Sequence, residues 1–214
     1  MSVLPDQPPR NLTSVPYAAV DASRFLAYGH SHGMPIWWGI VGLILVECVV
    51  FSALLASYFY LGFRQPEWPL PGVDDPELLW PLIGTAFLLA SAVSMHYADK
   101  AIDSDNQRAL RRNLIISIVL GAVFLALKIH EYAGKDYRWD SHPYGSIVWL
   151  IIGFHATHVV SLLLKTVVVC VLAFRGFFHR ANRLALVING FYWHFVVIVW
   201  IPIFLVIYIS PRLS

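Results

Sequence analysis

The chain has 214 residues, of which 58% are apolar and only 13% are charged, and its formal net charge is +2. A soluble domain carries about 25% charged residues, so this composition excludes an ordinary soluble fold. The small net charge argues against a nucleic-acid partner. The two cysteines, Cys48 and Cys170, both lie inside apolar runs, where a disulfide framework or a thiolate metal site would be badly placed.

Five segments are long and apolar enough to cross a bilayer, since about twenty residues at 1.5 Å each cover about 30 Å of hydrocarbon. We therefore predict an all-α, polytopic membrane protein whose transmembrane domain, residues 36–210, is a bundle of five helices. The predicted helices cover about residues 36–62, 78–97, 114–132, 144–174 and 184–209. Residues 1–35 form an N-terminal tail and residues 211–214 a short C-terminal tail.

Two local features refine this prediction. Asn113 precedes the most apolar part of the third segment, and its side chain predicts the N-cap of that helix. In the second segment, Ala86, Ala90 and Ser94 recur at every fourth position, which predicts a stripe for close helix packing.

The distribution of Lys and Arg predicts the orientation, because cytoplasmic loops carry an excess of these residues. Nine flank the spans on one side and four on the other. The richer side holds Arg10, Arg24, Lys100, Arg108, Arg111, Arg112, Arg175, Arg180 and Arg183, and the poorer side holds Arg64, Lys135, Arg138 and Arg212. The N-terminus should therefore be cytoplasmic and the C-terminus periplasmic, with the chain in a bacterial inner membrane.

A carboxyl group stands inside the first span. Glu47 lies about twelve residues into that span, near the middle of the bilayer, where a charge costs about 2.5 kcal/mol or more. The fourth span offers partners along one helical face, His155, His158 and Lys165. We predict a buried polar cluster in which Glu47 pairs with His155 or His158, for either proton handling or helix packing. Lys165 is close enough to the cytoplasmic interface for its amine to reach it.

A second polar cluster is predicted near the outer end of the third span. Lys128, His130 and Glu131 stand close together, and the spacing of Lys128 and Glu131 suits an intrahelical ion pair. In the last span, Trp193 and His194 form a polar-aromatic patch. Two facing imidazoles can hold a haem, so His158 with His194 is a weaker alternative reading.

Catalytic motifs are missing from the sequence: it contains no phosphate loop, nucleotide fingerprint, zinc-spaced Cys and His set or nucleophile elbow. We predict no catalytic residue and no metal ligand in this chain.

The ordered motifs resemble subunit III of haem-copper respiratory oxidases, that is, of cytochrome c and quinol oxidases. Four matches follow one another along the chain: Glu47 with the downstream run 56–61, the third-span ending around Glu131-Tyr132, the run Gly153-Phe154-His155-Ala156-Thr157-His158-Val159, and Tyr192-Trp193-His194-Phe195-Val196 followed by Val199-Trp200. Three positions depart from the family: Val46 stands where Ser is common, Lys128 where Gln is usual, and Val197 where Asp is frequent.

The resemblance implies a short, five-helix bacterial form without the first helix pair of longer members. It implies an accessory subunit that binds no redox cofactor, with haem and copper in the partner subunits I and II, and it is compatible with bound phospholipid. Its role would be to stabilise the catalytic subunit and to support proton uptake and turnover. Alternatives from the residues alone are a b-type cytochrome anchor, a small transporter, and a similar partner of a nitric oxide reductase.

Overall fold

The described residues of the computed structural model are 35–73, 76–135, 137–179 and 183–212, and they contain five helices long and apolar enough to cross a membrane. The helices are α2 (Pro35–Phe63), α3 (Leu79–Asp103), α4 (Gln107–Ala133), α5 (Pro143–Phe174) and α6 (Leu184–Phe204). A π-helical turn, Leu205–Ile209, and a 3-10 turn, Ser210–Arg212, continue α6. The chain is thus an all-helical, multi-pass membrane protein, as predicted; most of the predicted N-terminal tail lies outside the described residues.

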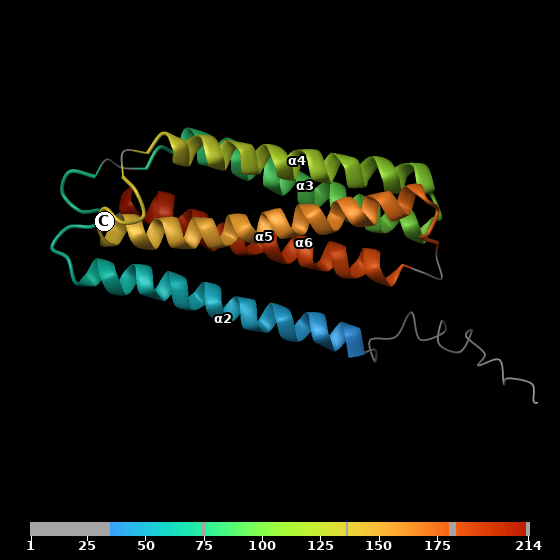
Figure 1. The fold of residues 1–214 in the computed structure, drawn as a ribbon, viewed down its shortest axis with the longest axis horizontal. Helices are drawn as coiled ribbons and strands as arrows, with labels where there is room; N and C mark the ends of the chain where they lie inside the picture. The colour runs from blue at the N-terminus through green and yellow to red at the C-terminus, as the bar shows by residue number, and fades with distance from the viewer. Residues whose placement is uncertain (1–34, 74–75, 136, 180–182, 213–214) are drawn as a thin grey trace, which may run out of the picture.

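The five helices run side by side in three groups (Figure 1). The pair α3 and α4 lies on one side, α5 and α6 lie in the middle, and α2 lies on the opposite side, where it packs against α5 and α6. One end of the bundle carries the C-terminus, and we refer to it as the C-terminal end. There α2 and α4 finish and α3 and α5 begin, so the connections 64–78 and 134–142 both lie at this end.

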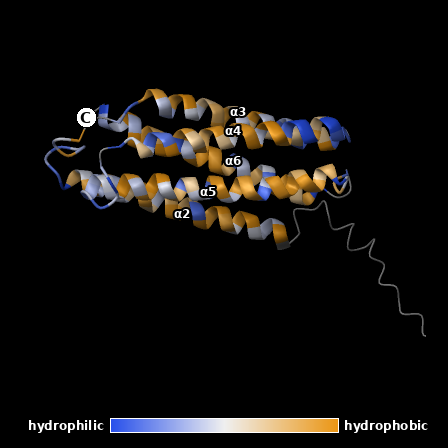
Figure 2. Ribbon diagram, turned by 45° about the horizontal axis from the view of Figure 1, so that its top comes forward, coloured by the Kyte–Doolittle hydropathy of each residue, from blue (hydrophilic) through white to orange (hydrophobic). Residues whose placement is uncertain are grey.

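The outward surfaces of these helices are predominantly apolar, whereas hydrophilic residues gather toward the helix ends and in the connections (Figure 2). Exposed large side chains on the helix exteriors include Leu45, Val49, Leu82, Ile129 and Ile198. Backbone polar groups are satisfied inside each helix, which is the condition for a stable span in hydrocarbon. The α5 helix, with 32 residues, is about 48 Å long and exceeds the thickness of the hydrocarbon layer.

The α3–α4 pair packs through small polar residues. Ser94 Oγ donates to the carbonyl of Asn113 at 2.9 Å, and Ser117 Oγ donates to that of Ser91 at 3.1 Å. The predicted stripe was therefore wrong in two of its three members: Ser94 is buried, but Ala86 and Ala90 are exposed. An α-helix has 3.6 residues per turn, so residues spaced four apart rotate progressively around the helix axis and do not all stay on the contact face.

The α4 helix starts earlier than the sequence predicts. Its N-cap is Asn106, whose side chain accepts a hydrogen bond from the backbone N–H of Ala109 at 3.0 Å. Asn113, the predicted cap, is buried within the helix, and its backbone carbonyl accepts hydrogen bonds from the hydroxyl groups of Ser94 and Ser117. The first turns of α4 are basic, with Arg108, Arg111 and Arg112, and apolarity alone could not place them in the helix.

Candidate functional site

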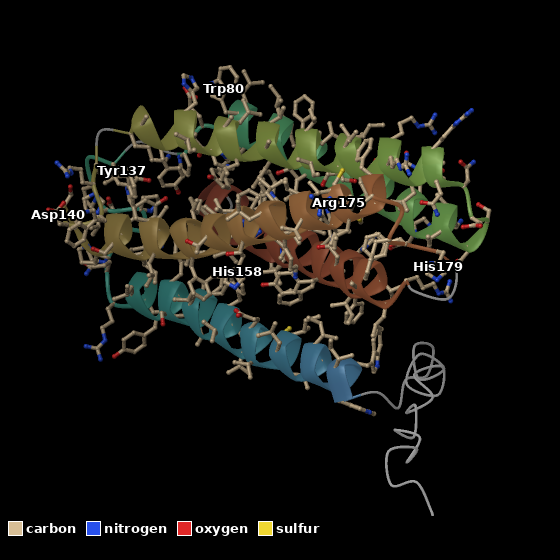
Figure 3. All side chains as sticks on the ribbon, turned by 45° about the vertical axis from the view of Figure 1, so that its right-hand side comes forward. Trp80, Tyr137, Asp140, His158, Arg175 and His179 are labelled. Atoms are coloured by element: carbon tan, nitrogen blue, oxygen red, sulfur yellow. The ribbon has the colours of Figure 1, made fainter. Side chains whose placement is uncertain are left out.

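A carboxyl group and an imidazole meet between α2 and α5. Glu47 Oε2 lies 2.9 Å from His158 Nε2, and the two side chains are 18% and 11% exposed. Glu47 lies about 18 Å along α2 from its start, and His158 about 22 Å along α5, so the pair is near mid-depth. His158 points into the space between the two helices (Figure 3). Of the two pairings that the sequence allowed, the structure contains Glu47 with His158.

The geometry of this pair requires one shared proton. The other ring nitrogen of His158, Nδ1, lies 2.8 Å from the carbonyl oxygen of Phe154, which can only accept. Nδ1 therefore carries a hydrogen, and a single further proton lies between Nε2 and Glu47 Oε2. The pair is either imidazolium with carboxylate or imidazole with carboxylic acid. Both forms satisfy His158 Nε2 and Glu47 Oε2, so a short proton shift converts one form into the other.

Aromatic rings enclose the histidine. The ring of Phe51, from α2, lies 5.3 Å from that of His158, and the ring of Phe154 lies 4.7 Å from it. Phe51 is 4% exposed. Because apolar rings remove water from around the imidazole, the hydrogen bond to Glu47 is stronger here than it would be in solvent.

His155 belongs to a different environment. Its Nε2 lies 3.2 Å from the carbonyl oxygen of Val196 in α6, and its ring packs 4.9 Å from that of Trp200. His155 is 1% exposed. It links α5 to α6 and does not take part in the glutamate pair, although it shares a helix face with His158.

Lys165 is not buried, contrary to the predicted cluster. The side chain is exposed on α5, and its amine lies 4.1 Å from the centre of the Tyr192 ring of α6. Seven residues, or about 10 Å of helix, separate it from His158. Its long apolar stem lets the ammonium reach an aromatic ring, a cation–π contact, while its Cα stays on the helix exterior.

The second predicted cluster forms a buried ionic network. Lys128 Nζ lies 2.6 Å from Glu131 Oε2 and 3.1 Å from the hydroxyl of Tyr208, and Tyr208 donates to Glu131 Oε1 at 2.7 Å. The ammonium also lies 4.7 Å from the centre of the Trp200 ring. Lys128 is 4% exposed, so the cation is held almost entirely by protein groups. His130 is exposed and stands outside this network, in contact with Trp80.

Two tryptophans of α6 donate hydrogen bonds to side chains of α3. Trp193 Nε1 donates to Ser91 Oγ at 3.0 Å, and Trp200 Nε1 donates to Thr85 Oγ1 at 2.8 Å. Both indole rings are almost fully buried. Large amphipathic rings with satisfied N–H groups pack helices together strongly, so this part of the signature is architectural.

The histidine arrangement does not favour a bis-histidine haem. Both ring nitrogens of His158 are engaged, by Phe154 and Glu47. His194 directs Nδ1 to the carbonyl oxygen of Gly190 at 2.7 Å. Within the described part of the chain, no three His, Cys, Asp or Glu side chains converge as metal ligands.

Sequence reasoning missed two groups that meet across helices. Tyr208 completes the ionic network, but one tyrosine in an aromatic-rich helix gives no signal of its own. Asp99, near the end of α3, packs against Gly190 of α6: a methyl group at Gly190 would overlap Asp99 Oδ2 and lie 2.9 Å from Oδ1. Asp99 lies two residues beyond the predicted end of the second span, and only the observed length of α3, Leu79–Asp103, brings it inside the helix.

Comparison with known proteins adds an independent result. The family model described as cytochrome c oxidase subunit III matches residues 26–211. A cytochrome c oxidase subunit 3 of Thermostichus vulcanus is 30% identical over 190 residues, which cover 87% of this chain and 94% of that protein. The subunit 3 of Synechocystis sp. is 30% identical, covering 86% and 79%, and that of Pongo pygmaeus is 28% identical, covering 88% and 76%.

The range matched by the family model spans all five helices and the segments that hold the Glu47–His158 pair, the ionic network and the tryptophans of α6. The chain belongs to the cytochrome c oxidase subunit III family.

Proposed function

We propose that this chain is the non-redox accessory subunit III of a haem-copper terminal oxidase, of the cytochrome c type, in a bacterial inner membrane. It packs beside a catalytic subunit I and a subunit II, which hold the haem and copper. The excess of Lys and Arg on one side supports a cytoplasmic N-terminus and a periplasmic C-terminal end. Its work is to stabilise the catalytic subunit and to sustain proton uptake during turnover.

The observation that carries this proposal is the Glu47–His158 pair on the most exposed helix. Only 11% of the most apolar stretch of α2 is buried within the chain, whereas its Glu47 holds a proton-sharing hydrogen bond to α5. A protonatable pair beside a surface open to partners and lipid influences the charge and the water access of a neighbouring subunit. Neither group needs a cofactor for this effect.

The association is tested by tagging the chain, extracting membranes in mild detergent and identifying by mass spectrometry the proteins recovered in stoichiometric amount. We expect a large polytopic subunit with haem absorbance and a copper-binding subunit. Recovery of the chain without them would contradict the proposal. Recovery with a nitric oxide reductase subunit would reassign the partner, and haem retained by the isolated chain would indicate a cytochrome anchor.

The role in turnover is tested in the purified complex with Glu47→Gln. We expect the variant to assemble normally and to lose activity faster during sustained turnover, with slower proton uptake in proteoliposomes. The matched control is Glu67→Gln, which neutralises an exposed carboxyl outside the helices. Equal inactivation and proton uptake in wild type and Glu47→Gln would contradict a role for the pair in proton handling.

A further inference from the structure

Lys165 is a charged residue on the outer surface of α5, within the part of the chain that spans the membrane. It lies about 14 Å along the helix from the last residue, Phe174. When the helix, about 48 Å long, is centred on about 30 Å of hydrocarbon, about 9 Å extends beyond each side. The Cα of Lys165 is then about 5 Å inside the apolar layer, where an ammonium group needs compensation.

The amine of Lys165 is held against the bundle at this depth. Its Nζ lies 4.1 Å from the centre of the Tyr192 ring, and Tyr192 is 7% exposed. The end of α5 and the start of α6 lie at the same end of the bundle (Figure 1). Tyr192 is about 12 Å along α6 from Leu184. The side chain thus contacts a residue inside the neighbouring span, at a level close to that of its own Cα.

The described residues supply no negative charge to this amine. A cation–π contact contributes about 0.5 to 2 kcal/mol but leaves the ammonium without a counter-ion. The ion pairs found in the described part of the chain do not include Lys165, and Glu47 directs Oε2 to His158. Ionisable groups within spans almost always face the interior or pair with one another. A counter-charge for Lys165 therefore has to come from outside the described residues.

The surface of α5 beside Lys165 is made of small residues. Ser161, Thr157 and Gly153 follow it at about one-turn intervals, and all are exposed; we call these four residues the Lys165 row. A Cβ added at Gly153 would meet no atom within 4 Å. Thr157 Oγ1 donates to the carbonyl of Gly153 at 2.9 Å, so the oxygen can still accept another hydrogen bond. Small side chains let the backbone of a second helix approach closely.

A membrane helix that carries a carboxylate fits this surface better than a lipid phosphate does. Lipid phosphates lie in the head-group region, outside the hydrocarbon layer, whereas a helix can present Asp or Glu at any depth. The small residues of the Lys165 row lie deeper than Lys165, where they offer close contact to a helix backbone. Opposite charge at the end of such a contact fixes its register and its partner.

We propose that the Lys165 row is a docking surface for a transmembrane helix of a neighbouring subunit, whose Asp or Glu forms an ion pair with Lys165 inside the membrane. This inference rests on the proposed function, since it requires assembly into a membrane complex. It adds the surface through which this chain is held and the charge that its partner presents there.

The contact is mapped in the whole complex, in native membranes, with the photo-crosslinking residue p-benzoylphenylalanine at position 161. We expect a covalent adduct between this chain and another membrane subunit. Mass spectrometry should place the attachment within about one helical turn, about 5 Å, of an Asp or Glu in a transmembrane segment. Adducts with lipid alone, or with the N-terminal tail of this chain, would overturn the proposal.

The charge is tested by recovery of the same subunit with the tagged chain. Lys165→Glu should lower its recovery at least about tenfold, because two carboxylates then face each other in the membrane. Lys165→Arg should retain it. Replacing the mapped carboxylate by Lys should restore recovery with Lys165→Glu, and this rescue also shows that the variant folds. Absence of rescue would contradict the ion pair.

The matched control is Lys100→Glu, which reverses an exposed cation near the end of α3, at the same end of the bundle as Lys165. It should leave recovery unchanged. Equal recovery with Lys165→Glu and Lys100→Glu would overturn the docking surface. If the wild-type chain recovers the haem-bearing subunit in that experiment, the proposed function stands and only the docking surface fails. A wild-type chain that recovers no partner would contradict both.

Discussion

The helices α2 and α6 are both strongly apolar, yet α2 lies at the edge of the bundle and α6 lies within it. Only 11% of the most apolar stretch of α2 is buried, against 56% for α6, which contacts α2, α3 and α5. In a bilayer, an apolar exterior is compatible with lipid and with protein alike, so apolarity identifies a span and not its neighbours. The two helices differ in their specific contacts: the buried indoles of α6 donate hydrogen bonds to α3, and Glu47 of α2 pairs with His158 of α5.

The largest expected effect tests the central position of α6. Trp200→Ala should destabilise the protein by about 3 to 5 kcal/mol, because it opens a cavity in the core and leaves the Thr85 hydroxyl without its indole donor. Trp38→Ala on α2, where the ring is 64% exposed, is the matched control and should change stability little. Thermal unfolding followed by loss of soluble protein in detergent measures both. Similar losses of stability in Trp200→Ala and Trp38→Ala would contradict a difference in burial between α6 and α2.

A smaller effect is expected where α6 meets α3. Gly190→Ala should cost about 1 to 3 kcal/mol, since the added methyl group overlaps the Asp99 carboxyl group. The double variant Gly190→Ala with Asp99→Ala should recover much of that loss, because the smaller side chain leaves room. The double-mutant cycle is measured by the same unfolding assay. Additive effects would show that the two residues do not contact each other in the folded protein.

The smallest effect on stability is expected at the polar pair between α2 and α5. Glu47→Gln should cost under about 1 kcal/mol, since the amide can still hydrogen-bond His158 Nε2 while the shared proton is lost. Glu47→Ala should cost more, because it leaves Nε2 of the imidazole without a partner. Unfolding assays on both variants, read beside the turnover assay, separate packing from proton handling. A loss of stability in Glu47→Gln as large as that in Trp200→Ala would show that the α2–α5 contact stabilises the fold as much as the packing of α6 does.

The sequence by itself determined the fold class, the five spans and the presence of a carboxyl group at mid-depth. These follow from local physics: the length of apolar runs, and the cost of placing Glu47 in hydrocarbon without a partner. The motifs around Glu47, His155, His158 and Trp200 also indicated the family. The i, i+3 spacing of Lys128 and Glu131 is local as well, and that ion pair is present in the structure.

Only the tertiary structure decided which groups meet. His155 and His158 lie on one helix face, but a difference of three residues turns one toward Val196 of α6 and the other toward Glu47 of α2. Tyr208, 80 residues from Lys128, completes the ionic network, and Gly190 makes room for Asp99. The physical reason is that these contacts depend on how whole helices rotate and approach one another. Packing across the bundle sets that geometry. Hydropathy and residue spacing along one helix do not determine it.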